Sequence, residues 1–207
     1  MNDTIPLLGL STTPLELTAF VLAALTVYLN IRQNHWAWLF AIVSSALYAV
    51  VFFGARLYGD MALQGVFIAV STWGWYQWLF GGAQHTALKV SWLGRAGERY
   101  SLLAWSLGFV LLAWFLRTWT NTDVPYIDGF LTAGSLVGQV LIARKKIENW
   151  IVWIVVDVLY VGLYLYKGLM LTAILYFVFI IMAAIGLYAW RRDARAGRPA
   201  WAARAVR

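Results

Sequence analysis

The sequence predicts an all-α integral membrane protein with seven transmembrane helices, arranged as two parallel three-helix repeats joined by one further helix (3+1+3). Three observations predict this class. Of the 207 residues, 62% are hydrophobic and only 12% are charged, whereas a soluble domain carries about a quarter charged residues. Seven apolar stretches have roughly the 20 residues that cross a bilayer. The chain also contains an internal repeat, which points to a duplicated architecture.

The seven predicted spans follow one another through mostly short connections. The exception is the polar, glycine-rich segment 81–100, and a basic tail, 191–207, follows the last span. Residues 1–31 contain no Lys or Arg, so the basic region of a cleavable signal peptide is missing and the first span is expected to remain as a membrane helix. The predicted spans cover residues 14–32, 37–54, 61–80, 101–119, 127–144, 149–166 and 169–190.

Positive charges predict the orientation of these spans. Thirteen of the sixteen Lys and Arg residues fall on one side, among them the six arginines of the tail 191–207. Only Arg56, Arg117 and Lys167 fall on the other side. Basic residues concentrate in cytoplasmic loops. We therefore expect the N-terminus outside and the C-terminus in the cytoplasm.

The internal repeat appears when the chain is shifted by 112 residues, which aligns 15–78 with 127–190 without a gap. The shift pairs identical aromatic residues in one register: Trp38 with Trp150, Tyr48 with Tyr160 and Trp78 with Trp190. Apolar composition alone does not readily produce such matches. We interpret the two segments as three-helix repeats and 101–119 as the linking helix. Corresponding helices are four crossings apart, so the repeats run parallel, as in transporters whose substrate binds between two halves.

The predicted sixth span, Asn149–Tyr166, carries one carboxylate, Asp157, near its middle. An acid at bilayer depth costs about 2.5–3.5 kcal/mol on insertion scales, which makes it a candidate functional residue. On a helix, Trp150, Trp153, Asp157 and Tyr160 follow one another by three or four residues and share a face. An acid beside flat aromatic rings suits an aromatic cation. The alternative, a carboxylate that only fixes helix packing through hydroxyl or indole donors, stays open.

Further polar and aromatic residues complete the candidate ligand-binding set. Gln64 on the third span and Gln139 on the fifth carry amides that are costly to bury. Hydrogen bonds between helices explain the buried amides as well as ligand binding does. Tryptophans near span ends favour the lipid headgroup region whether or not a ligand is bound. The candidate set is Asp157, Trp153, Trp150, Asn149, Tyr160, Gln64, Gln139, Tyr176, Trp75 and Trp38.

The sequence argues against several other classes of protein. It has no cysteine, and its two histidines, His35 and His85, fall in different predicted connections, so we expect no metal site and no cofactor. It has no G-x-S-x-G motif, no Walker-type nucleotide motif and no chain of membrane acids, which disfavours enzymes and driven pumps. Basic residues lie at span ends rather than on one surface, so nucleic acid is not an expected partner.

Three runs, LYAVVFFGARLYGDMALQ, GWYQW and ENWIVWIVVDVLYVGLYLYKGLMLTAILY, resemble the nicotinamide riboside transporters of the PnuC type. The similarity covers nearly the whole core, from the first span to the seventh. It implies a fold similar to the SWEET sugar transporters and uptake by facilitated diffusion, with trapping by a cytoplasmic kinase. A homotrimer is a further implication. The wider family includes members thought to carry thiamine or riboflavin, and some nicotinamide riboside carriers have asparagine at the position of Asp157.

We therefore expect a transporter of nicotinamide riboside, with thiamine or another B-vitamin as the alternative substrate and a non-transporting membrane subunit as a third interpretation. Trp153, with Trp150 or Tyr176, would stack on the positive pyridinium ring, where a desolvated cation–π contact is worth about 2 kcal/mol. Asp157 would balance the charge or accept hydrogen bonds from the sugar. The substrate amide and ribose would pair with the amide side chains of Gln64, Gln139 and Asn149.

Overall fold

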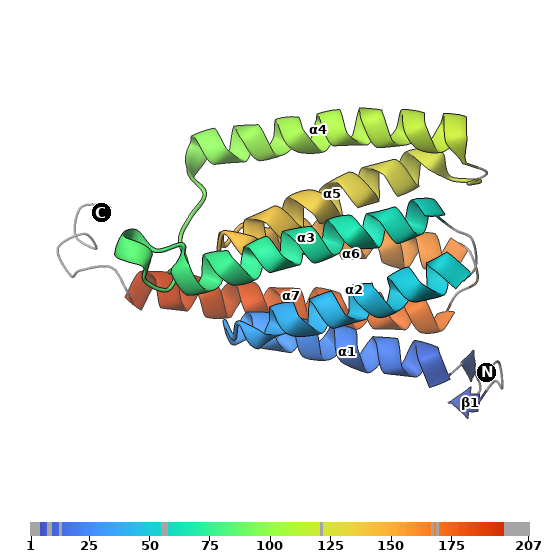
Figure 1. Cartoon of the computed structure of the whole chain (residues 1–207), viewed down its shortest axis with the longest axis horizontal. Coiled ribbons are helices and arrows are strands. Elements are labelled where there is room, and N and C mark those ends of the chain that lie inside the picture. The colour runs from blue at the N-terminus through green and yellow to red at the C-terminus, as the bar shows by residue number, and fades with distance from the viewer. Residues whose placement is uncertain are drawn as a thin grey trace.

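The computed structural model describes residues 5–7, 10–12, 14–54, 58–120, 122–166, 168 and 170–196; within these ranges, side chains are described from residue 21 onward, except at 48, 51–63 and 171. In this part of the chain, seven long helices run up and down in one bundle (Figure 1). The helices are α1 (Pro14–Ile31), α2 (Trp36–Gly54), α3 (Tyr58–Phe80), α4 (Gly94–Trp119), α5 (Pro125–Ala143), α6 (Asn149–Tyr166) and α7 (Met170–Ala196).

In the described part of the chain, three short elements accompany the helices. A two-stranded antiparallel hairpin, β1 (Ile5–Leu7) with β2 (Leu10–Thr12), precedes α1, and the sequence patterns did not predict it. A single 3₁₀ turn, η1 (Ala83–His85), lies in the connection between α3 and α4. The connections after α1, α3 and α5 lie at one end of the bundle, where α7 also ends (Figure 1).

The helices match the predicted spans except where a helix continues past its apolar part. The fourth begins at Gly94 instead of residue 101, and the seventh continues to Ala196 instead of ending near 190. Alanine, arginine and glutamate are good helix formers, so the backbone stays helical after the hydrophobic stretch has ended. The basic tail therefore starts as an extension of α7 through 191–196, and 197–207 lie outside the described residues.

Four helices in the described part of the chain are long and apolar enough to cross a membrane: Gly94–Trp119, Pro125–Ala143, Asn149–Tyr166 and Thr172–Ala196. Shorter apolar stretches occupy Val21–Ile31 and Trp36–Leu47. Most of the large apolar side chains of α4 face outward, and Leu107 and Trp114 are 63% and 61% exposed. A continuous exposed apolar face is typical of a membrane or partner contact, so this helix is suited to a bilayer.

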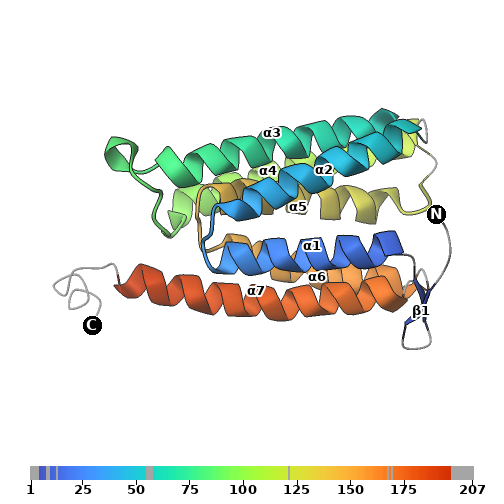
Figure 2. The same ribbon diagram turned by 60° about the horizontal axis from the view of Figure 1, so that its bottom comes forward.

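The bundle consists of two halves, α1–α3 and α5–α7, with α4 packed on the outside of α5 (Figures 1 and 2). Within each half, consecutive helices pack against each other. Between the halves, α1 packs against α7 and α3 against α5. The first helix of each half thus meets the third helix of the other. This reciprocal order is what two parallel repeats related by a rotation would produce.

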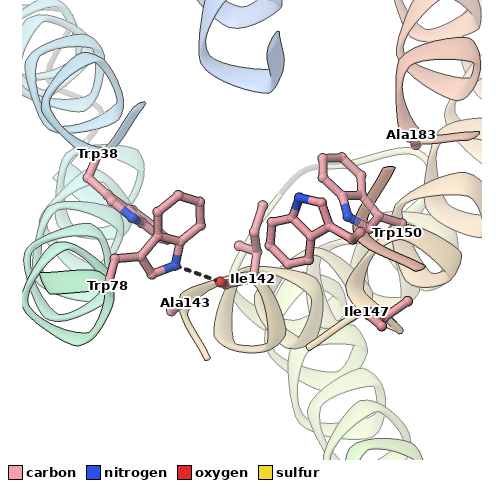
Figure 3. Packing of buried hydrophobic residues seen from close by; sticks show 8 residues of the cluster. Trp38, Trp78, Ile142, Ala143, Ile147, Trp150 and Ala183 are labelled. Carbon is pink, nitrogen blue, oxygen red and sulfur yellow. Dashed lines mark hydrogen bonds between the residues drawn. The ribbon is translucent and has the colours of Figure 1, made fainter. Parts of the chain in front are cut away.

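Four buried tryptophans form the core at the end of the bundle where α5 and α6 connect. Trp38 and Trp78 meet edge to face at 5.5 Å and 89°, and Trp150 and Trp190 do so at 5.4 Å and 87°. The members of the second pair lie 112 residues after those of the first. Edge-to-face contacts add about 0.5–1.5 kcal/mol beyond area burial. We call these four residues the tryptophan cluster; Figure 3 shows Trp38, Trp78 and Trp150 around Ile142.

Two indole hydrogen bonds of this cluster cross between the halves in opposite directions. Trp78 Nε1 donates to the carbonyl of Ile142 at 2.9 Å, the bond drawn in Figure 3. Trp190 Nε1 donates to the carbonyl of Ile31 at 3.3 Å. In each case the third helix of one half contacts the last turn of the first helix of the other half. The Ile142 carbonyl also accepts the backbone N–H of Lys145 at 2.9 Å, so the indole of Trp78 is a second donor to it.

The connection before α4 is held against the turn between α5 and α6. The backbone N–H of Ser91 donates to the Lys145 carbonyl, and the N–H of Ile147 donates to the Ser91 carbonyl, both at 3.1 Å. The Glu148 carboxylate accepts the N–H of Leu93 at 3.0 Å. Inside this turn Lys145 is buried, with its Nζ 4.5 Å from the centre of the Trp78 ring.

Burial lowers the pKa of Lys145 from 10.5 to about 8. Between these values the unfolded chain holds a proton that the folded chain has released, so stability rises with pH across this window. Below about pH 8 both states are protonated and the folded protein bears the full cost of a buried charge. We expect the melting temperature of the purified protein to rise between pH 8 and 10, and the Lys145→Met variant to lose most of that rise. The exposed Lys89→Met variant should keep it; an unchanged pH response in Lys145→Met would contradict the argument.

Candidate functional site

A cavity of about 410 Å³ lies between the two halves. Its volume is within the usual range for small-molecule sites, about 300–1,000 Å³. All six helices of the two halves contribute to its wall, and α4 does not. The wall consists of Leu22, Ala23, Thr26, Val27, Asn30, Ala41, Ser44, Ser45, Gln64, Phe67, Ser71, Gln139, Ile142, Trp150, Trp153, Asp157, Tyr176, Phe179 and Ala183.

The tryptophan cluster closes one end of this cavity. Ile142, Trp150 and Ala183 belong both to the cavity wall and to the buried core around the cluster. The cavity therefore ends in tightly packed aromatic side chains at the end of the bundle that the charge pattern predicts to be cytoplasmic.

Six of the ten predicted ligand-binding residues lie in the cavity wall. They come from four helices: Gln64 from α3, Gln139 from α5, Trp150, Trp153 and Asp157 from α6, and Tyr176 from α7. The structure thus brings together an acid, two amides and three aromatic rings that are far apart in the sequence.

The other four predicted residues lie outside the cavity wall. Trp38 is 2% exposed and packs against Gly74 and Trp78. Asn149 is fully buried at the start of α6, where its Nδ2 donates to the Lys146 carbonyl at 2.6 Å.

Trp75 and Tyr160 make ring contacts away from the wall. The ring centres of Trp75 and Trp36 are 6.0 Å apart. Tyr160 stacks on Tyr164 with ring centres 5.6 Å apart and an angle of 11° between the ring planes. Helical spacing puts Tyr160 on the same face of α6 as Asp157. That face extends beyond the cavity, so Tyr160 lies outside the wall.

Asp157 lies deep in the wall, with 4% of its surface exposed. Among the described residues no lysine, arginine or histidine forms an ion pair with it; Arg192 and Asp193 pair with each other at the exposed end of α7. A buried carboxylate without a protein counter-charge favours a cationic group in the adjacent space. The carboxylate of Asp157 thus makes the cavity suited to a positively charged ligand.

The aromatic rings beside Asp157 are held by their surroundings. The Trp153 ring lies against α5 where Gly138 leaves room, since a Cβ there would be 3.1 Å from ring atom Cε2. The centre of the Tyr176 ring lies 4.8 Å from that of Tyr160, 5.0 Å from that of Tyr164 and 5.6 Å from that of Phe179. Rings fixed in this way offer a flat surface at little entropic cost, which suits stacking on an aromatic ligand.

The predicted set of ten leaves out five polar residues of the wall, namely Thr26 and Asn30 on α1, Ser44 and Ser45 on α2, and Ser71 on α3. Asn30 lies in the last turn of its helix, where a polar residue looks like an ordinary helix end. The usable signal was the spacing of four residues between Thr26 and Asn30, which places both on one face of an otherwise apolar span.

Comparison with known proteins gives consistent matches over most of the chain. A family model described as nicotinamide mononucleotide transporter matches residues 13–192. The riboflavin/roseoflavin transporter RibM of Streptomyces davaonensis is 28% identical over 194 residues, which cover 89% of this chain and 88% of RibM. The nicotinamide riboside transporter PnuC of Escherichia coli is 25% identical over 181 residues, covering 75% and 76%. A crystal structure of the vitamin B3 transporter PnuC superposes with a TM-score of 0.66 at 25% identity, over 87% of this chain and 81% of that one.

Proposed function

The chain belongs to the nicotinamide mononucleotide transporter family, and from that premise we propose that it takes up nicotinamide riboside. Membership makes it a membrane transporter of the PnuC family and not an enzyme. It also removes the interpretation as a non-transporting membrane subunit.

One observation carries the choice of substrate. Asp157 lies in the wall of the cavity between the halves, beside the rings of Trp153 and Tyr176. A flat pyridinium cation fits this combination, because the acid balances its charge while the rings stack on its face. Gln64 and Gln139, in the same wall, can pair with the carboxamide and ribose of the ligand. PnuC of Escherichia coli, a relative with this substrate in its name, supports the same choice.

Riboflavin is the second candidate, favoured by the similarity to RibM over 89% of the chain. Its ring system is neutral, so it would leave Asp157 without a counter-charge, and we rank it below nicotinamide riboside for that reason. Thiamine, a cation with an aromatic ring, satisfies the same electrostatic demand and is the alternative to be tested beside it.

We propose facilitated diffusion as the mode of transport, with net uptake sustained by a kinase that phosphorylates the substrate in the cytoplasm. The sequence offers no nucleotide-binding motif that would couple transport to ATP. The proposed setting is a bacterial inner membrane crossed by seven spans in a SWEET-like 3+1+3 arrangement. The N-terminus is outside, the C-terminus is cytoplasmic, and the oligomer is a homotrimer.

Reconstitution of the full chain into protein-only vesicles tests this function. Labelled nicotinamide riboside should enter until inside and outside concentrations are equal, whether or not a proton or sodium gradient is imposed. Unlabelled nicotinamide riboside should compete better than thiamine or riboflavin. Accumulation above the outside concentration under a gradient would contradict facilitated diffusion, and entry of riboflavin alone would move the substrate to the second candidate.

A further inference from the structure

Resting on the proposed function, we propose that the cavity binds its ligand in one fixed orientation. The aromatic ring lies against α6 and α7, and a sugar or polyol group lies against a polar wall on α1, α2 and α3. We call this second surface the polar wall; it consists of Thr26, Asn30, Ser44, Ser45, Gln64 and Ser71.

The cavity is built from equivalent positions of the two halves that carry different side chains. Seven pairs of residues separated by 112 positions line it, with one member from each half. In only one pair, Phe67 with Phe179, are the two residues identical. Elsewhere the two members differ in chemistry, as with Ser45 and Asp157. The backbone positions are therefore symmetric while the chemistry is not, so a ligand turned through the repeat axis would meet different partners.

Aromatic and charged groups gather on the second half. Four of the five aromatic residues in the wall, Trp150, Trp153, Tyr176 and Phe179, come from α6 and α7, and so does Asp157. The repeat counterpart of Trp153 is Ala41, so the equivalent position of the first half carries a methyl group in place of an indole ring. Stacking and charge compensation are thus available on this side.

Hydroxyl and amide groups gather on the first half. Asn30 Oδ1 is buried without a hydrogen-bond partner in the described part of the chain. The Thr26 hydroxyl donates to the Leu22 carbonyl at 2.8 Å, so its oxygen is still able to accept. A buried polar group left unpaired costs about 1–3 kcal/mol, which a ligand hydroxyl beside it would recover. Ser, Thr, Asn and Gln supply both donors and acceptors, as recognition of several adjacent hydroxyls requires.

The substrate class follows from this division. The ligand is an aromatic ring system joined to a group with several hydroxyls. Nicotinamide riboside and riboflavin both fit this description, with a ribose and a ribityl chain. Thiamine, with a single hydroxyl, uses little of the polar wall. The polar wall therefore selects for the hydroxylated group, whereas Asp157 selects for the charge of the ring.

Calorimetric titration of the purified full chain tests the division with matched ligands. Nicotinamide riboside is compared with 1-methylnicotinamide, and riboflavin with lumiflavin; in each second compound a methyl group replaces the sugar or polyol. We expect Asn30→Leu and Ser45→Ala each to lower affinity for the hydroxylated ligand by about fivefold or more, and to leave affinity for its methyl counterpart unchanged. Thr72→Val, which removes an exposed hydroxyl of α3 next to Ser71, is the matched control and should change neither.

Two results would overturn the division: a variant that loses affinity equally for both ligands of a pair, or a variant whose affinity for the hydroxylated ligand is unchanged. Binding by the wild-type protein would still support the proposed function in either case. If wild type binds none of the four ligands, the proposed function falls, and this inference falls with it. Size-exclusion profiles and melting temperatures verify folding. If Asn30→Leu is unfolded, Ser45→Ala and Ser44→Ala decide the question by the same comparison.

Discussion

Replacing Asp157 by asparagine should weaken binding of nicotinamide riboside more than tenfold and leave binding of neutral riboflavin nearly unchanged. The substitution keeps the shape of the side chain, removes its charge and replaces one acceptor oxygen by an NH₂ donor. Because Asp157 is 4% exposed in the cavity wall, its attraction for a cation is poorly screened by solvent. A tenfold change corresponds to about 1.4 kcal/mol, well within the value of a buried charge pair.

Calorimetry of the wild type, Asp157→Asn and Asp157→Ala measures this effect, and Glu98→Gln, which neutralises an exposed carboxylate of α4, is the control. Asp157→Ala should weaken binding of the cationic ligand at least as much as Asp157→Asn. If a folded Asp157→Ala variant binds and transports nicotinamide riboside like the wild type, Asp157 is a packing residue and the proposed site is wrong.

The helices were predictable because hydropathy determines which segments can cross a bilayer. Two helices extend beyond their predicted spans, α4 before residue 101 and α7 after residue 190, and both extensions contain Arg and Ala, with Glu in that of α4. These residues are polar enough to end a hydrophobic stretch and helix-forming enough to continue the helix. The hairpin before α1 gave no strong signal, since two strands of three residues carry too few positions for an alternating pattern.

The candidate site was predictable in part, and the limits follow from its symmetry. Trp38 and Trp150 are repeat counterparts, and no pattern in the sequence separates their roles. In the structure Trp150 reaches the cavity wall and Trp38 does not, although each packs against the equivalent glycine. A repeat register predicts equivalent backbone positions. Which of two counterparts reaches the cavity depends on the sizes of the side chains around it, and these differ between the halves, as with Ala41 and Trp153.

The Gly186→Ala variant should lose about 1–3 kcal/mol of stability and bind ligand more weakly than wild type. In most helix interiors the same change is stabilising by roughly 0.5–1 kcal/mol, since glycine is the poorer helix former. Here a Cβ would lie 2.6 Å from ring atoms Cε2 and Cζ2 of Trp150, so the indole must move. Because Trp150 lines the cavity, its movement should also disturb the bound aromatic ring.

The repeat provides the controls for this result. Gly74 has the same relation to Trp38, with a Cβ 2.6 Å from ring atom Cη2, but Trp38 lies outside the cavity wall. Gly74→Ala should therefore destabilise the protein to a similar extent with a smaller loss of affinity. Gly65→Ala, on the same helix with nothing within 4 Å, should be as stable as wild type or more so. Thermal unfolding and calorimetry of the three variants distinguish these effects. A Gly186→Ala variant as stable as Gly65→Ala would mean that the glycine is not needed for the packing of Trp150.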